Sequence, residues 1–371
     1  MLSVRMAHAR PRPWFFIALA LSALACAHPE GAASPAAPPA AATGASASFA
    51  SSASSASSAP SASLASATVG DAGAPATGAR DALPATLPYT PSTVRTPDGL
   101  TIAVQTWGHS KGTPIVFVHG LAQSHLSWGR QTSSELARDF RLVTYDLRGH
   151  GDSDKPLGAA YYEEGRRWGD ELSAVLDALG PSRPVVVGWS LGGGVIVNYL
   201  AAHGDGRLSG IVFVDAVTRA DRAELPGVPP IGSPDLATRV AAGRRFLLDC
   251  FAVPPAGEAF ETMLAYNAQV PRHVLATTFR SFLEGTDPAL AATRVPVLLV
   301  HGTEDKLVKV GMSEKTAALV PGARLSRYER TGHAPFYEQA GRFNSEIAAF
   351  MRKVETERGP TTPPRVSSSN P

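Results

Sequence analysis

Gly188-Trp189-Ser190-Leu191-Gly192 is the stretch that decides the fold of this 371-residue chain. It follows Pro184-Val185-Val186-Val187, which is typical of a buried strand, and it precedes residues 193–200, which are typical of a helix packed on a sheet. A tight turn between such a strand and helix lifts the serine hydroxyl off the sheet, towards helix N–H groups that stabilise negative charge. Gly188 and Gly192 remove the side chains that would collide where strand and helix cross.

Two further motifs accompany the serine turn, one before it and one after it in the chain. Together they give the order serine, acid, histidine that one large family uses. A buried-strand run, Ile115-Val116-Phe117-Val118, ends in His119-Gly120-Leu121. A second run, Val297-Leu298-Leu299-Val300, leads through a turn to Asp305, and His333 comes 28 residues later. With the nucleophile-elbow pattern at Ser190 and the loop at 145–153, these motifs resemble the α/β-hydrolase superfamily over roughly residues 94–353.

The resemblance implies a Ser-His-Asp mechanism. Ser190 would be the nucleophile, His333 the base that takes its proton, and Asp305 the acid that orients the imidazole. The backbone N–H groups of Leu121 and Leu191 would stabilise the tetrahedral oxyanion. The resemblance implies no metal and no cofactor.

Other residues near these motifs offer alternatives. Asp215 also ends an apolar strand, and some family members take the acid from that position, so it remains an alternative to Asp305. Glu304 lies one residue off the family pattern. Four neighbours are interpreted as structural rather than catalytic: His119, Asp146, Arg148 and His301.

The rest of the domain predicts an α/β fold with a mostly parallel sheet and helices on both faces. Residues 101–107 alternate between apolar and polar, as in a half-exposed antiparallel strand, and 161–179 has the apolar spacing of a helix. Short apolar runs predict the buried parallel strands. These runs are 115–118, 141–145, 185–187, 211–214 and 297–300.

Residues from 216 to about 294 predict a helical cap inserted after the strand 211–214, since they contain no convincing strand. Ser233-Pro234 predicts an N-cap and first helical position for a helix reaching about Cys250, and 271–284 predicts a second helix. Some of the cap's apolar side chains should line an acyl pocket. The candidates are Phe246, Leu247, Phe251, Met263, Leu264, Phe279 and Phe282.

The N-terminus predicts export. Residues 1–25 carry three arginines and then a 12-residue apolar segment, a pattern typical of a signal peptide and too short for a comfortable membrane span. Ala23-Leu24-Ala25-Cys26 resembles a bacterial lipobox, in which Cys26 would be lipidated and anchor the protein to a membrane. Ordinary signal cleavage and an uncleaved anchor are the alternatives.

Composition divides the remaining chain. Residues 26–86 are mostly Ala, Ser, Pro and Gly, which predicts a disordered tether, and 355–371 predicts a disordered tail around a hydrolase domain at 87–354. Removing the three n-region arginines from the formal charge of +2 leaves −1 for a chain starting at Cys26, so no basic field for nucleic acid is expected. If Cys26 is lipidated, Cys250 is left without a disulfide partner.

These patterns predict a serine hydrolase that cleaves carboxylic esters of small or medium apolar acyl groups, with a small-molecule ester as its partner. Haloalkane dehalogenases and epoxide hydrolases resemble it in fold but carry aspartate where Ser190 stands. Carbon–carbon bond hydrolases usually carry asparagine where Trp189 stands. A carbon–carbon hydrolase, a perhydrolase and a non-catalytic membrane-tethered binding module remain as alternatives.

Overall fold

The computed structural model describes residues 87–278, 283 and 285–358. The predicted signal peptide at 1–25, the lipidation site Cys26, the tether at 26–86, and Phe279 and Phe282 of the cap lie outside the described residues. The predicted tail at 355–371 lies outside them from residue 359 onwards.

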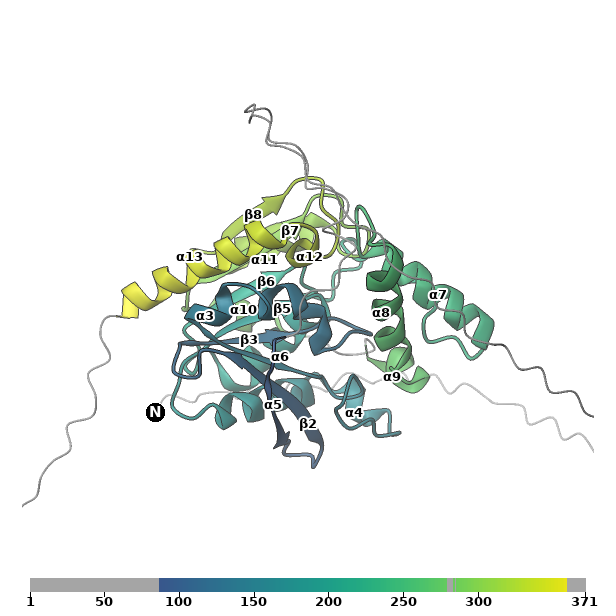
Figure 1. Cartoon of the computed structure of the whole chain (residues 1–371), viewed down its shortest axis with the longest axis horizontal. Coiled ribbons are helices and arrows are strands. Elements are labelled where there is room, and N and C mark those ends of the chain that lie inside the picture. The colour runs from purple at the N-terminus through teal and green to yellow at the C-terminus, as the bar shows by residue number, and fades with distance from the viewer. Residues whose placement is uncertain (1–86, 279–282, 284, 359–371) are drawn as a thin grey trace, which may run out of the picture. The chain divides into compact units, whose positions relative to one another are not determined.

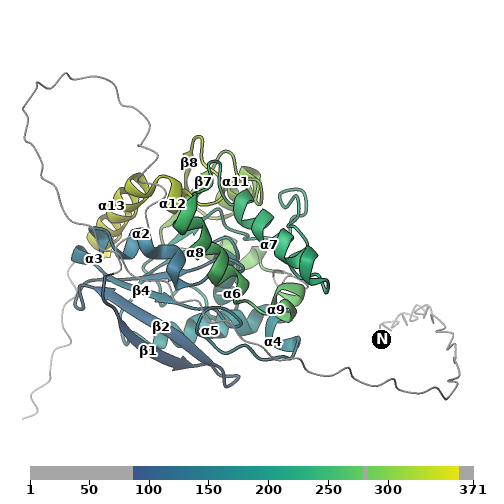
Figure 2. The ribbon, with the colours of Figure 1, turned by 45° about the vertical axis from the view of Figure 1, so that its right-hand side comes forward.

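An eight-stranded sheet forms the centre of the domain (Figures 1 and 2), in the order β1-β2-β4-β3-β5-β6-β7-β8. Its strands are β1 (Thr90–Arg95), β2 (Thr101–Gly108), β3 (Pro114–Val118), β4 (Arg141–Tyr145), β5 (Val185–Trp189), β6 (Gly210–Val214), β7 (Val297–Gly302) and β8 (Arg324–Tyr328). β2 runs antiparallel to β1 and to β4, and every other neighbouring pair is parallel. The α/β fold with a mostly parallel sheet is therefore confirmed.

All six strands predicted from the sequence are present, and the two missed strands are the edges of the sheet. β1 is exposed along most of its length, and β8 reads Arg-Leu-Ser-Arg-Tyr with exposed arginines. Edge strands bury only part of their surface, so they lack the continuous apolar run that marks β3, β5 and β6.

The parallel register brings the carboxyl ends of four strands to one edge of the sheet. Val118 of β3 pairs with Gly188 of β5, which pairs with Phe213 of β6, and Phe213 pairs with Leu299 of β7. The residues that follow these strands therefore emerge side by side, which is where open α/β sheets place their ligands.

Helices cover both faces, as the crossovers require. One row of contacting helices is α5 (Gly165–Ala178), α6 (Leu191–His203), α10 (Asp287–Ala292) and α11 (Val310–Leu319). The opposite face carries α2 (Gly129–Thr132), α3 (Leu136–Asp139), α12 (Pro335–Glu338) and α13 (Ala340–Arg358). Figure 2 shows α2, α3 and α13 gathered on that side.

Two helix boundaries differ from the sequence predictions, and one short helix was not predicted. The segment 161–179 is two helices, α4 (Ala160–Glu163) and α5, because the backbone is extended at Glu164 (φ −85°, ψ 109°). α13 continues to Arg358, past the boundary predicted at 354. A short 3-10 helix, η1 (His125–Trp128), follows β3.

The insertion after β6 contains α7 (Leu236–Asp249), α8 (Gly257–Ala268) and α9 (Arg272–Thr277), which lie together on the right-hand side of Figure 1. Asp235, rather than Ser233, caps α7 by accepting the Thr238 N–H at 2.8 Å, so Pro234 is not its first residue. The sequence did not predict α8. The expected helix over 271–284 is described only as α9.

The end of the predicted cap belongs to the sheet layer. α10 packs against α6 and α11, although the sequence prediction extended the cap to about residue 294. Because α10 spans only Asp287–Ala292, it is too short to show the apolar periodicity of a helix, and the sequence could not distinguish it from the cap.

Candidate active site

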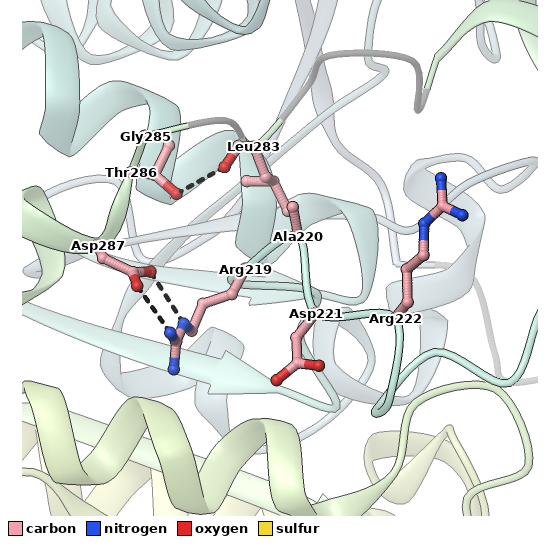
Figure 3. A pocket seen from close by; sticks show the side chains of 8 residues that line it. All are labelled: Arg219, Ala220, Asp221, Arg222, Leu283, Gly285, Thr286 and Asp287. Atoms are coloured by element: carbon pink, nitrogen blue, oxygen red, sulfur yellow. Dashed lines mark hydrogen bonds and ion pairs between the residues drawn. The ribbon is translucent and has the colours of Figure 1, made fainter.

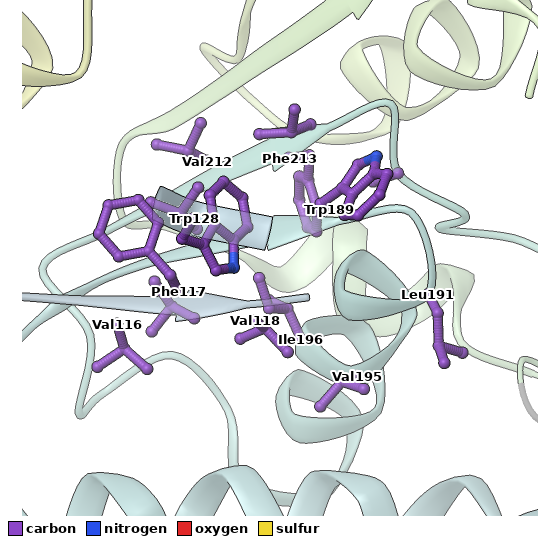
Figure 4. Packing of buried hydrophobic residues seen from close by; sticks show 14 of the residues in the cluster. Val116, Phe117, Val118, Trp128, Trp189, Leu191, Val195, Ile196, Val212 and Phe213 are labelled. Carbon is purple, nitrogen blue, oxygen red and sulfur yellow. The ribbon is translucent and has the colours of Figure 1, made fainter. Parts of the chain in front are cut away.

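Ser190 occupies a sharp turn between β5 and α6. Its backbone has φ +53° and ψ −117°, a region that non-glycine residues rarely adopt and that is enriched at functional sites. The predicted role of the flanking glycines agrees with the packing. A Cβ on Gly192 would lie 2.3 Å from the Val118 carbonyl oxygen, and one on Gly188 would lie 2.6 Å from the Gly192 oxygen. Figure 4 shows Trp189 and Leu191 on either side of this turn.

His333 and Asp305 are hydrogen-bonded, although 28 residues separate them in the chain. Nδ1 of His333 lies 2.6 Å from Oδ2 of Asp305, and the side chains of both residues are buried. The other oxygen of Asp305 accepts the backbone N–H groups of Leu307 and Val308 at 2.8 and 3.0 Å. The carboxylate is thus held on both sides, with one oxygen reserved for the imidazole.

A tryptophan ties His333 to the serine turn. The indole Nε1 of Trp189 donates to the carbonyl oxygen of His333 at 2.7 Å, and the two rings lie 5.7 Å apart. Because Trp189 immediately precedes Ser190, this bond brings the predicted base to the predicted nucleophile. The structure therefore gathers Ser190, His333 and Asp305 at one place.

Asp215, the alternative acid, lies in the same cluster. Its side chain is fully buried, and ligand-capable atoms of Asp215, Asp305 and His333 all lie within 4.8 Å of one another. Oδ1 of Asp215 accepts the Gly302 N–H at 2.8 Å, whereas its Oδ2 has no hydrogen-bond partner among the described residues. Nδ1 of His333 is hydrogen-bonded to Asp305 and not to Asp215, so the geometry favours Asp305 as the partner of the imidazole.

The two carboxyl groups have opposite pKa shifts. Burial raises the pKa of Asp215 well above its ordinary value, and the nearby negative charge of Asp305 adds to that rise, although the charge of His301 opposes it. Burial would also raise the pKa of Asp305, but the charges and hydrogen bonds of His333 and His301 bring it well below its usual range. This asymmetry favours a protonated Asp215 beside an ionised Asp305.

His301, which the sequence indicated as structural, lies beside these two carboxyl groups. Its Nε2 lies 3.5 Å from Oδ2 of Asp305 and 3.6 Å from Oδ1 of Asp215, and it donates to the Val308 carbonyl oxygen at 2.9 Å. Burial lowers its pKa, but the two carboxyl groups raise it more, to about 9. The one available signal was its position, four residues before Asp305 at the end of β7.

The same cluster contains the groups that come closest to a metal site. Asp215, Asp305 and His333 offer two carboxylates and an imidazole. The facing atoms of Asp305 and His333 are already joined by a 2.6 Å hydrogen bond, which a cation would have to replace. The arrangement therefore suits proton sharing better than metal binding.

The loop after β3 carries the predicted oxyanion donor Leu121. A Cβ on Gly120 would lie 3.2 Å from the Cβ of Ser190, so this loop runs directly past the serine. Among the described residues, neither the Leu121 N–H nor the Leu191 N–H has a protein acceptor. The next N–H, that of Ala122, is already donated to Nε2 of His150 at 3.1 Å.

A buried network holds this loop in place. Ala122 has φ +57°, and its carbonyl oxygen accepts from Nδ2 of Asn267 in α8 at 3.1 Å. Burial lowers the pKa of His150 to about 3, so it stays neutral and can accept the Ala122 N–H. Arg148, fully buried, pairs with Glu171 at 2.7 Å and with Asp98 at 2.9 Å, in agreement with its structural interpretation.

A small cavity lies beside the cluster, between the cap helices and the sheet edge. Its volume is about 10 Å³, room for a single water molecule. The lining residues are Gln123, Ser127, Trp189, Leu247, Cys250, Phe251, Met263, Tyr266, Ala334, Phe336 and Tyr337. Leu247, Phe251 and Met263 were predicted as pocket candidates. Phe246 is instead buried in the core, and Leu264 does not line the cavity.

A second, open hollow lies beside α10 (Figure 3). Three of its charged side chains already have partners, because Arg219 bonds Asp287 at 2.7 Å and Asp221 bonds Lys315 at 2.6 Å, and Arg222 is the remaining charged residue of the lining. None of the predicted site residues lines it. The predicted site residues lie instead at the carboxyl edge of the sheet. Across 87–278, 283 and 285–358, no helix is both long and apolar enough to span a membrane.

Comparisons with known proteins agree with this geometry. Residues 115–346 match the model of the alpha/beta hydrolase family. A solved structure from Burkholderia cenocepacia, described as a candidate aryl esterase, is 40% identical with a TM-score of 0.69, over 71% of this chain and 99% of that one. An esterase structure from a Rhodococcus species is 35% identical with a TM-score of 0.66, over 71% and 99% of the two chains. A bifunctional esterase/perhydrolase from Acinetobacter calcoaceticus is 29% identical over 70% of this chain and 99% of its own length.

Proposed function

This chain belongs to the alpha/beta hydrolase family, and we propose that within it the protein is a serine carboxylic ester hydrolase for small or medium apolar acyl groups. The observation that carries the proposal is the 2.6 Å bond between His333 and Asp305 beside Ser190, whose backbone is in a strained turn. Relatives described as esterases, at 35% and 40% identity over most of their length, support ester hydrolysis in general.

The proposed reaction proceeds through an acyl-enzyme. Oγ of Ser190 attacks the ester carbonyl carbon while Nε2 of His333 takes its proton, and Asp305 stabilises the resulting imidazolium. The N–H groups of Leu121 and Leu191 would bind the oxyanion, each contributing roughly 3–4 kcal/mol. His333 then returns the proton to the leaving alcohol. A water molecule, deprotonated by His333, releases the acid.

Turnover of p-nitrophenyl esters from acetate to laurate by residues 85–371 tests the proposal, with the Ser190→Ala variant as the control. We expect serine-dependent turnover with an optimum at short chains, because the cavity has little free volume. Folded wild-type protein that hydrolyses no ester and does not react with a phosphonate probe would exclude a serine esterase. It would leave the binding module as the remaining function.

Perhydrolysis is a second candidate, favoured by the relative described as a bifunctional esterase/perhydrolase. In that reaction hydrogen peroxide replaces water in attack on the acyl-enzyme and a peroxy acid leaves. Peroxy-acid formation from acetate esters and peroxide, absent in Ser190→Ala, would support it. For carbon–carbon bond hydrolysis, product analysis provides the test.

We further propose that the enzyme is exported and anchored to a bacterial membrane through a lipid on Cys26. The n-region arginines, the 12-residue apolar segment and the lipobox-like Ala23-Leu24-Ala25-Cys26 support this proposal. An anchored enzyme would meet its ester substrates in the cell envelope.

A further inference from the structure

The small cavity described above lies where an acyl group would sit, if the proposed ester hydrolysis is correct. Two of its lining residues, Trp189 and Ala334, are the chain neighbours of Ser190 and His333. On the opposite side, Leu247 of α7 and Met263 of α8 close it. An acyl chain bound to Ser190 would therefore enter it by moving the cap side chains.

One side chain that lines the cavity is polar and only partly hydrogen-bonded. Gln123 is 3% exposed, and its amide nitrogen Nε2 is buried with no hydrogen-bond partner among the described residues. A buried amide without a partner costs free energy, and native structures retain few of them. Its presence next to the site of chemistry calls for a ligand that supplies the missing acceptor.

The Ser127 hydroxyl determines which end of the Gln123 amide is left unpaired. Oγ of Ser127 donates to Oε1 of Gln123 at 3.2 Å, which identifies Oε1 as the accepting end of the amide. The amide oxygen is then satisfied and its two N–H donors are not.

We propose that Gln123 is a specificity-determining residue, whose amide donates a hydrogen bond to an oxygen carried by the acyl group of the substrate. The substrates would be esters of compact acids that bear an ether or carbonyl oxygen along a short, otherwise apolar chain. The remaining lining side chains fit such a group, since Trp189, Phe251 and Phe336 offer apolar and aromatic surface. The hydroxyl of Ser127 is already engaged by the Gln123 oxygen.

Three p-nitrophenyl esters of equal length test the proposal: pentanoate, 3-methoxypropanoate and 2-ethoxyacetate. They differ in whether a CH₂ group or an oxygen stands at one chain position. The measured quantity is the ratio of kcat/KM for each ether ester to kcat/KM for pentanoate. Intrinsic reactivity differs among the esters, but it cancels when the ratio is compared between wild type and variant.

The test variant is Gln123→Met, which keeps a similar length and removes both donors. The matched control is Gln269→Met, the same change at an exposed position that ends α8. We expect Gln123→Met to lower the ratio for at least one ether ester about tenfold. The control should leave all ratios at their wild-type values.

The wild-type enzyme supplies a second measurement that does not depend on whether the variant folds. Its ether-to-pentanoate ratio, divided by the same ratio for alkaline hydrolysis, should exceed about ten for at least one ether ester. A ratio near one, or ratios unchanged by Gln123→Met while pentanoate is still hydrolysed, would overturn the inference. Absence of turnover on all three esters would instead overturn the proposed function, and the inference with it.

Discussion

Replacing Asp305 by asparagine should abolish most activity without removing the side chain. In the native protein one carboxylate oxygen accepts the N–H groups of Leu307 and Val308 at 2.8 and 3.0 Å, and the other accepts Nδ1 of His333 at 2.6 Å. The single oxygen of an asparagine would take the two backbone donors. Its NH₂ group would then face His333, which would have to accept at Nδ1 and carry its proton on Nε2, towards Ser190. An imidazole in that tautomer cannot take the serine proton.

The size of the loss follows from the buried, charged bond that is removed. Breaking a buried ion pair by removing one charge costs about 3–5 kcal/mol, which is a factor of about 10²–10⁴ in rate. The wrong tautomer acts in the same direction and brings the expected loss in kcat close to 10⁴. Asp215→Asn should lose less than about tenfold, because burial favours a protonated Asp215 and asparagine preserves its acceptor for the Gly302 N–H.

Both variants are measured by steady-state hydrolysis of p-nitrophenyl acetate, with phosphonate labelling to count active serines and thermal unfolding to confirm folding. The reasoning is refuted if Asp215→Asn loses as much as Asp305→Asn, or if Asp305→Asn keeps more than a tenth of the wild-type kcat. A mild loss in Asp305→Asn together with a large loss in Asp215→Asn would assign the acid to Asp215, the alternative that the sequence left open.

Four further changes test other parts of the structure. Ser190→Ala should lower ester turnover about 10³-fold or more, and a loss below tenfold in folded protein would remove Ser190 from the mechanism. Gly192→Ala places a Cβ 2.3 Å from a main-chain carbonyl oxygen and should lower the free energy of unfolding by about 1–3 kcal/mol. The control Gly341→Ala meets no atom within 4 Å and should not destabilise the protein. Equal melting temperatures of the two variants would contradict the close approach at Gly192. Burial lowers the pKa of His150 to about 3, so between pH 4 and 6 the unfolded chain binds a proton that the folded protein does not, and stability falls as pH falls. His150→Asn should reduce that slope by about 1.4 kcal/mol per pH unit, and denaturation curves with an unchanged slope would exclude a buried neutral histidine. Cys26→Ser should release the protein from the membrane fraction, and continued retention would favour an uncleaved anchor.

The central fold and the gathering of the site could be predicted because their signals are local. The strands β3, β5, β6 and β7 are continuous apolar runs, and parallel strands necessarily bring the residues after them to one edge. For this reason Ser190 and Asp305 could be expected at one edge before any coordinate was known. His333 follows β8, a strand that was missed, so its place beside them was expected only from the resemblance to the α/β-hydrolase superfamily. The cap was predicted less well. α8 has no strong apolar stripe, and the start of α7 depended on whether Ser233 or Asp235 supplied the cap.

The sequence by itself determined the class of fold, the strained serine turn and the three residues expected to act, since each depends on residue type and order along short segments. Only the tertiary structure decided how the buried charges share their protons. His301 and Asp305 lie at the end of β7 and Asp215 follows β6, and their pKa values depend on separations of a few ångströms across these two buried strand ends. It also decided that the amide of Gln123 is left without a partner. A hydrogen bond depends on the distance and direction between two groups, and for distant segments of the chain the order of residues specifies neither.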